Sequence, residues 1–147
     1  MGGGSTLLRI RAACVESIEM HARETYPEEC CGFLIGPSKT RPRRIVTARR
    51  ARNVAPSDRE RRYTIEPIEI LTVEKSLRGS SNGILGFYHS HPDHPAAPSA
   101  YDRERASWPG YSYLILSIRK REPAALTAWK LVRQAGPFVP DRLTIEG

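Results

Sequence analysis

A short segment near position 90 carries the residues whose types and spacing suggest chemistry. His89 and His91 are separated only by Ser90, at the end of an apolar run with the sequence ILGFYHSH. Alternate side chains of a β-strand lie on one face, so both imidazoles would face the same point while Ser90 faces away. Imidazole is a common zinc ligand. The pair therefore suggests part of a metal site, although two histidines alone are weak evidence.

A catalytic zinc site takes a third protein ligand and keeps one position open. Asp102 follows the pair after a proline-rich loop over residues 92–98, which turns the chain back. Ser99 stands at the expected N-cap of the next helix, so Asp102 falls in the first turn at the same end of the strand. Ser99 and Asp102 also match an ordinary capping box, which would be the preferred interpretation if they stood alone. Together with the histidines they favour a site for one zinc ion per chain.

The rest of the chain must supply the elements that position these side chains. Hydrophobic periodicity predicts a helix over residues 11–26. Proline at a first helical turn predicts a second helix over residues 67–77, and residues 99–107 are expected to form a short third helix. Apolar or alternating runs bounded by turn residues predict strands over residues 6–10, 29–36, 43–55, 84–91, 111–119, 124–133 and 138–145. The consecutive strands near the carboxyl end favour a partly antiparallel sheet in an α/β-type fold. Residues 1–5 are Gly-rich and expected to be disordered, and residues 6–147 are expected to form one domain.

The segment from His89 to Asp102 is similar to a known motif. HSHP, six further residues, Ser, two residues and Asp resemble the JAMM signature of the MPN-positive metalloproteases in every defined position. The family motif also has a glutamate well upstream, and Glu29 in the stretch YPEECCG resembles it, with Glu28 as the alternative. The resemblance implies a single JAB1/MPN-like domain of the α/β (α+β) class. Its mixed curved sheet would be flanked by two main helices and a short helix at the site.

The resemblance also implies a role for each residue of the motif. His89, His91 and Asp102 would hold the zinc ion. Glu29 would be the catalytic acid–base, which takes a proton from the attacking water and later gives it to the leaving amine. Burial would raise the pKa of Glu29, whereas the charge of zinc would lower it. Ser99 would donate a hydrogen bond to the tetrahedral oxyanion and would still be free to cap the helix through its oxygen.

The short chain looks more like the stand-alone prokaryotic members of this family than the eukaryotic ones, which carry insertions. Those prokaryotic members are associated with small ubiquitin-like sulfur-carrier proteins that end in Gly-Gly. The implied function is a zinc-dependent metallopeptidase or isopeptidase that hydrolyses a bond at the C-terminal Gly-Gly of such a partner. The alternative is a non-catalytic, MPN-type protein-binding scaffold, and the presence of all five functional positions argues against it.

Composition and net charge indicate which kinds of partner are expected. The chain has 147 residues and a net charge of +7, with arginines concentrated between Arg41 and Arg62. We interpret this stretch mainly as a solvated face; a docking surface for an acidic partner is the alternative. It lacks the interleaved aromatic residues of a single-strand binder, so no nucleic-acid partner is expected.

No apolar run would span a membrane, no signal peptide is recognisable, and the three cysteines form a poor disulfide framework. The expected compartment is the cytoplasm, with the oligomeric state left open.

Other side chains near the motif are given less direct roles. His94 lies outside the family's ligand positions and is expected at the surface or the substrate rim, although its spacing would also suit a third imidazole ligand. His21, on the first helix, is expected to be structural. Cys30 and Cys31 point in opposite directions along a strand, so one of them is expected in the core; metal binding is the alternative for a cysteine close to the site. Trp108 is expected to pack beside the site.

Overall fold

The computed structural model describes residues 7–147, so the disorder predicted for residues 1–5 lies outside the described part of the chain. The described residues form three helices, α1 (Ala12–Thr25), α2 (Pro67–Leu77) and α3 (Ala100–Arg105). The strands are β1 (Leu7–Arg11), β2 (Cys31–Pro37), β3 (Arg43–Ile45), β4 (Thr47–Ala51), β5 (Asn82–Pro92), β6 (Ser112–Arg119), β7 (Glu122–Leu131) and β8 (Phe138–Glu146). No helix within residues 7–147 is long and apolar enough to cross a membrane.

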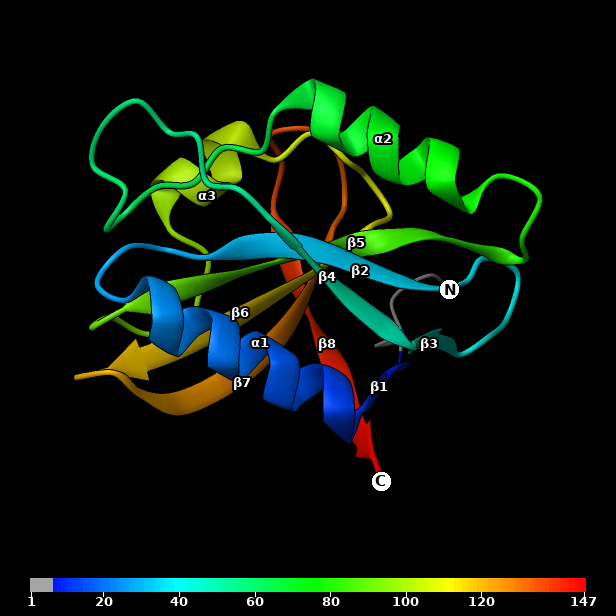
Figure 1. The fold of residues 1–147 in the computed structure, drawn as a ribbon, viewed down its shortest axis with the longest axis horizontal. Helices are drawn as coiled ribbons and strands as arrows, with labels where there is room; N and C mark the ends of the chain where they lie inside the picture. Colours follow the sequence, from blue (N-terminus) through cyan, green and yellow to red (C-terminus); the bar gives the residue numbers. More distant parts are fainter. Residues whose placement is uncertain (1–6) are drawn as a thin grey trace.

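The strands form one mixed and strongly curved sheet in the order β3-β1-β8-β7-β6-β5-β2-β4 (Figure 1). β1 is parallel to β3 and β8, and β5 is parallel to β6, whereas the other neighbours are antiparallel. The two edge strands, β3 and β4, are separated in the chain by Val46 alone. The sheet must therefore curl until its two edges approach each other. The single strand predicted over residues 43–55 was wrong, because the chain changes partner at Val46 from β1 to β2 and leaves the sheet after Ala51.

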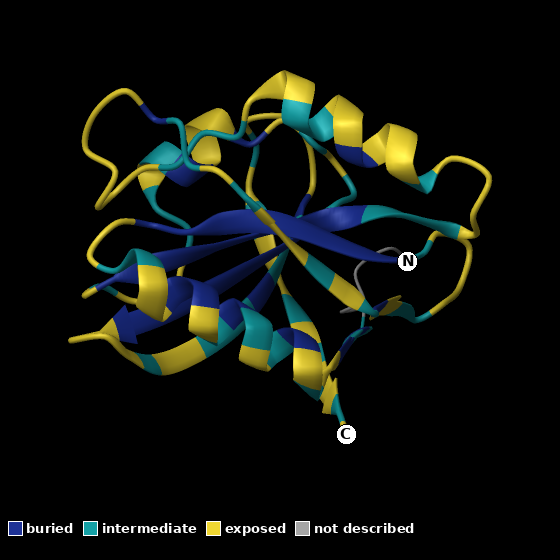
Figure 2. Cartoon of the chain, viewed as in Figure 1, coloured by how far each residue is buried: buried dark blue, intermediate teal, exposed yellow. Residues whose placement is uncertain are grey.

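Helices cover the sheet on both faces, which buries its central strands (Figure 2). On one face Ile18 of α1 packs in a core with Leu34 of β2. On the other face Val73 of α2 packs in a second core with Phe33. Neighbouring residues of a strand point to opposite faces, so β2 needs apolar side chains at successive positions. This explains why its sequence reads as a continuous apolar run and not as an alternating one.

The hairpin between β6 and β7 is tighter than the sequence suggested. Lys120 and Arg121 alone connect the strands, with φ angles of 49° and 70°. Two central residues with positive φ suit the right-handed twist of the flanking strands. The predicted strands left residues 120–123 as the turn, but because neither Lys120 nor Arg121 is Gly or Asn, the sequence carries no signal for a turn of only two residues. β7 consequently begins at Glu122, two residues before the predicted start at residue 124.

Candidate metal centre and active site

β5 carries His89 and His91 on one face, where both side chains are buried. Their Nε2 atoms lie 3.1 Å apart. Ser90 faces the other way, and its Oγ accepts a hydrogen bond of 2.8 Å from the backbone N–H of Cys30. The alternation of a β-strand therefore brings the two imidazoles together, as the spacing predicted.

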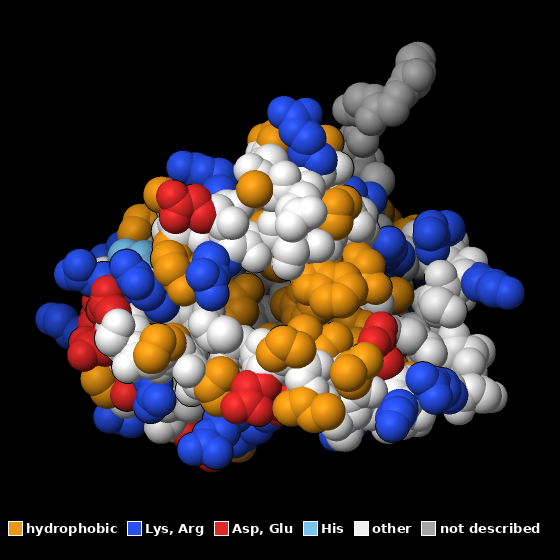
Figure 3. All heavy atoms as spheres, turned by 90° about the horizontal axis from the view of Figure 1, so that it is seen from above, with side chains coloured by type: hydrophobic (Ala, Val, Ile, Leu, Met, Phe, Trp, Pro, Cys, Tyr) orange, Lys and Arg blue, Asp and Glu red, His pale blue; other side chains and the backbone are white. Residues whose placement is uncertain are grey.

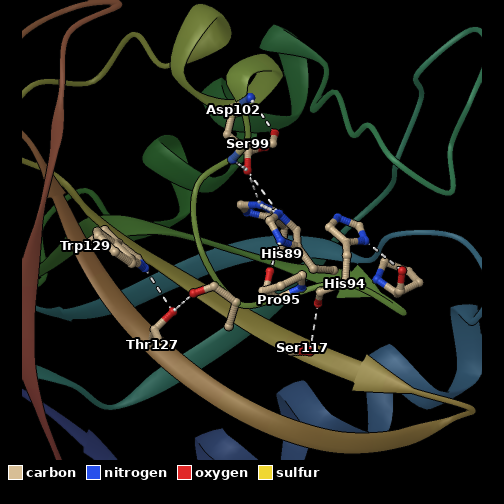
Figure 4. A network of polar contacts seen from close by, with 11 residues as sticks. His89, His94, Pro95, Ser99, Asp102, Ser117, Thr127 and Trp129 are labelled. Carbon is tan, nitrogen blue, oxygen red and sulfur yellow. Dashed lines mark hydrogen bonds and ion pairs between the residues drawn. The ribbon is translucent and has the colours of Figure 1, made fainter.

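Asp102 of α3 completes a triangle of donor atoms with the two histidines (Figure 4). Its Oδ2 lies 3.2 Å from His89 Nε2 and 3.0 Å from His91 Nε2. The same oxygen accepts a hydrogen bond of 3.0 Å from the backbone N–H of Ser99, whose Oγ accepts one of 3.0 Å from the backbone N–H of Asp102. The capping box is thus present, and it also holds the carboxylate toward the histidines.

The donor atoms of this triangle fit a zinc ion. Two imidazole nitrogens and one carboxylate oxygen are ordinary ligands of catalytic zinc, and bonds of about 2.0–2.1 Å in a tetrahedron place ligand atoms roughly 3.3 Å apart. The observed separations are 3.0–3.2 Å. His91 Nδ1 lies 2.7 Å from the carbonyl oxygen of Pro95. Because a carbonyl oxygen only accepts, that contact leaves the lone pair of His91 on Nε2, toward the triangle.

The ionisation state of Asp102 also suits a metal ligand. Burial opposes ionisation, but the neighbouring His89 imidazole, which also contacts the carboxylate, and the hydrogen bond from the Ser99 backbone N–H outweigh it and hold the pKa of Asp102 well below its usual range. The carboxyl group is therefore ionised over the whole physiological pH range, which is the form that binds a metal.

Glu29 reaches this site through the register of β2 and β5. Cys31, the first residue of β2, pairs with His89 in the antiparallel ladder, so the residue two positions before β2 falls opposite His91. That residue is Glu29, which is buried, whereas Glu28 is exposed. The structure thus favours Glu29 over Glu28 for any role at the triangle.

The environment of Glu29 favours its protonated form. Neither carboxyl oxygen has a hydrogen-bond partner within residues 7–147. Burial, and then the negative charges of Asp102 and Asp58, raise the pKa of Glu29 to about 9. A cation at the triangle would act in the opposite direction. The backbone is fixed, because the Glu29 N–H donates to Arg59 O at 2.8 Å and its carbonyl accepts from Asn53 Nδ2 at 3.1 Å.

The proline-rich loop of the motif is anchored to the sheet by side chains of β6 and β7 (Figure 4). Ser117 Oγ donates to the carbonyl oxygen of His94 at 2.8 Å. Thr127 Oγ1 donates to the carbonyl oxygen of Ala96 at 2.6 Å and accepts from Trp129 Nε1 at 2.9 Å. These contacts fix the segment that joins the histidines to α3. These contacts could not be expected from the sequence, because hydroxyl residues on strands are common.

Tyr63 is a further residue that sequence reasoning missed. Its ring stacks on that of His89, with centroids 4.5 Å apart and planes 27° apart. His89 Nδ1 is buried and has no hydrogen-bond partner within the described residues. The contact with Tyr63 therefore replaces the usual hydrogen bond in orienting this imidazole.

A pocket of about 380 Å³ opens beside Asp102. Most of its walls are apolar or aromatic, and its lining includes Tyr63, Ile65, Phe87, Tyr101, Trp108 and Tyr113. Viewed from above, apolar side chains gather on this face of the molecule (Figure 3). The expected position of Trp108 beside the site is confirmed. Arg105 also lines the pocket, and both it and Arg62 lie over the ring of Tyr101.

The remaining predictions for single residues have mixed outcomes. His94 is half-buried and stacks on His91, so it lies beside the triangle without belonging to it. His21 is structural, since its Nδ1 lies 2.7 Å from the buried hydroxyl of Tyr88. One of Cys30 and Cys31 was expected in the core, and Cys30 packs there with Ile18 and Leu34. Both are buried, because the start of β2 is covered on both faces.

Comparison with known proteins gives a consistent set of relatives. Residues 11–132 match the family described as prokaryotic homologs of the JAB domain. Desampylase of Haloferax volcanii is 42% identical over 117 residues, which cover 77% of this chain and 82% of that protein. CysO-cysteine peptidase of Mycobacterium tuberculosis is 31% identical over 127 residues, which cover 86% of this chain and 84% of that protein.

The fold is also similar to that of a solved structure from this family. A JAB1/MPN domain protein of Archaeoglobus fulgidus superimposes with a TM-score of 0.58 at 16% identity, covering 96% of this chain and all of that one (100%). At this identity the likeness concerns the fold alone. It agrees with the mixed curved sheet, the two main helices and the short third helix.

Proposed function

This chain belongs to the prokaryotic JAB-domain branch of the JAMM/MPN family, and from that premise we propose that it is a zinc-dependent peptidase or isopeptidase. Its substrate is a ubiquitin-like or sulfur-carrier protein, cut at the C-terminal Gly-Gly. The observation that carries the proposal is the close triangle of His89 Nε2, His91 Nε2 and Asp102 Oδ2, with the buried carboxyl group of Glu29 beside it. A scaffold would not need that combination.

Three residues would hold the metal, and two would handle the reacting groups. His89, His91 and Asp102 are the ligands. Zinc bound there supplies a Lewis acid, which polarises a carbonyl group and makes water more acidic. The carboxylate of Glu29 takes a proton from the attacking water and later gives it to the leaving amine.

Ser99 donates a hydrogen bond to the oxyanion of the tetrahedral intermediate. Its oxygen accepts from the Asp102 N–H, and its own hydrogen remains available for this bond. Removing one such donor typically costs about 10²–10³ in turnover.

The surroundings of the site support a protein substrate with an acidic surface. The apolar pocket beside Asp102 can receive side chains next to the scissile bond. Arg62 and Arg105 at its edge add positive charge, which would speed the encounter with an acidic carrier. The names of the two relatives, desampylase and CysO-cysteine peptidase, agree with this class of substrate.

The test combines metal content with cleavage. Inductively coupled plasma mass spectrometry of wild type and His91→Ala, prepared side by side, should give about one zinc per chain and almost none. A ubiquitin-like carrier joined through its Gly-Gly terminus to a fluorescent reporter should then be cut by the zinc form alone. The matched substrate with Ala-Ala in place of Gly-Gly should resist. Bound zinc without cleavage of any Gly-Gly substrate would contradict the proposed activity, and absence of zinc after metal is offered would contradict the site itself.

A further inference from the structure

A second set of donor atoms adjoins the triangle on the side of His91. The ring of His94 stacks on that of His91, with centroids 4.3 Å apart and planes 21° apart. Glu29, His91 and His94 each place one ligand-type atom within 4.8 Å of the others. Glu29 is only 1% exposed and His94 is half-buried. The carboxyl group thus lies near two stacked imidazoles, one of which belongs to the triangle.

Each residue of this second set can offer a lone pair to a cation, Glu29 once its carboxyl group is ionised. His94 Nδ1 lies 2.7 Å from the carbonyl oxygen of Pro92. Because that oxygen only accepts, Nδ1 carries the hydrogen and Nε2 is left with its lone pair. Both oxygens of Glu29 lack a hydrogen-bond partner within the described residues. Buried acceptors without a donor are unfavourable, and a cation or a shared proton between them would relieve this.

The loop makes the same kind of contact with His94 as with His91. In each case the carbonyl oxygen of a proline, Pro92 or Pro95, lies 2.7 Å from Nδ1. A backbone carbonyl on the second ring nitrogen is the usual support of a metal-binding histidine. This shared arrangement favours a cation over a proton as the partner of His94.

We propose that Glu29 and His94 together bind a second and weaker divalent cation, which is zinc when zinc is in excess, and that this cation inhibits the enzyme. His91 Nε2 belongs to the triangle, so His91 forms a wall of the second site and does not ligate there. Two protein ligands hold a metal less tightly than three. The inhibition rests on the proposed function of Glu29, because a carboxylate bound to a cation cannot take up a proton from water. The binding itself does not depend on that function.

Zinc binding to the metal-free protein tests the site directly. Isothermal titration calorimetry should resolve two classes of site in wild type, with the second at least about tenfold weaker than the first. His94→Ala and Glu29→Gln should retain the first class and lose the second. His94→Phe should behave in the same way while keeping the ring stacked on His91, which guards against a loss caused by a misplaced loop. Glu28→Gln, which changes an exposed neighbour, should retain both classes.

Turnover at increasing zinc concentration tests the inhibition. Wild type and Glu28→Gln should lose activity over the concentration range in which the second site fills, and His94→Phe should resist. A single class of site in wild type at millimolar zinc, or an unchanged second class in both His94 variants, would overturn the second site. Two classes with unchanged turnover would overturn the inhibition and leave the site. If no substrate is ever cut, the proposed function fails, whereas calorimetry still decides the second site.

Discussion

Glu29 lies opposite His91 because the register that pairs Cys31 with His89 continues for two residues before β2 begins. The backbone N–H of Ser90 donates to the carbonyl oxygen of Cys30 at 3.1 Å, which extends the register in that direction. One pair of strands therefore places the buried carboxyl group and the imidazoles on the same face. A shift of one residue would turn Glu29 away from the site and bring Glu28 or Cys30 to it.

Glu29→Gln should abolish turnover and preserve zinc. The amide keeps the shape of the side chain but cannot accept and return a proton, so the rate of hydrolysis should fall by about 10²–10⁴. Single-turnover cleavage and zinc content would be measured on the same sample. Glu28→Gln is the matched control and should keep both. A Glu29→Gln enzyme that cleaves within a few fold of wild type would show that another group is the base.

Paired substitutions of Ser99 separate its two roles. Ser99→Ala removes the hydroxyl group and the cap, and it should lower the free energy of unfolding by about 1 kcal/mol, whereas Ser99→Gly should lose only a few tenths. Neither variant can donate to an oxyanion, so both should lose about 10² in turnover while zinc content stays near one per chain. Thermal unfolding followed by circular dichroism gives the stability. Turnover that follows stability across the two variants, and not the missing hydroxyl, would identify capping as the main role of Ser99.

The anchor of the loop on β7 should affect zinc affinity without touching the metal. Thr127→Val keeps the volume of the side chain but removes the hydrogen bonds to Ala96 and from Trp129. Because such supporting contacts commonly change metal affinity 10–100-fold, we expect zinc to bind about tenfold more weakly. Competition with a chelator of known affinity measures this. Thr72→Val on the exposed face of α2 removes a hydroxyl bonded to Ile68 O and should leave zinc affinity unchanged. Equal affinities for both variants would contradict the role of the loop anchor.

The parts of the site that follow from local pattern could be predicted from the sequence. The alternation around Ser90 and the cap at Ser99 each depend on a few adjacent residues, and the resemblance linked them to Glu29. The stack of Tyr63 on His89 and the anchor at Thr127 depend on where distant segments return to the loop, and no local pattern encodes that.

The fold shows the same division between local and distant determinants. The first long helix and most strands follow from apolar patterns, and the second long helix follows from the proline at its first turn. The change of partner at Val46 does not, because it depends on the curvature of the whole sheet. A turn after residue 119 was predicted, but its two-residue form at Lys120 and Arg121 was not, since residues with long side chains rarely adopt positive φ.

His21 should make the stability of the protein depend on pH. Burial, followed by the charge of Arg50, lowers its pKa to about 4 in the folded state, against the opposing effect of Glu24. In the unfolded chain the pKa would be about 6.5. Above pH 6.5 the imidazole is neutral in both states and this stabilisation is complete. As the pH falls toward 4, only the unfolded chain takes up the proton, so the folded state loses up to about 3 kcal/mol.

A difference measurement isolates this contribution from the other titrating groups. Urea unfolding of metal-free wild type and His21→Gln would be followed between pH 7 and pH 4. The glutamine can still accept a hydrogen bond from Tyr88 but does not titrate, so the stability of wild type relative to the variant should shrink as the pH falls. Other carboxyl and imidazole groups contribute equally to both proteins and cancel. A difference that stays constant across this range would mean that the folded state accommodates a charged His21, and the buried pair with Tyr88 would then not be the acid-sensitive element of the fold.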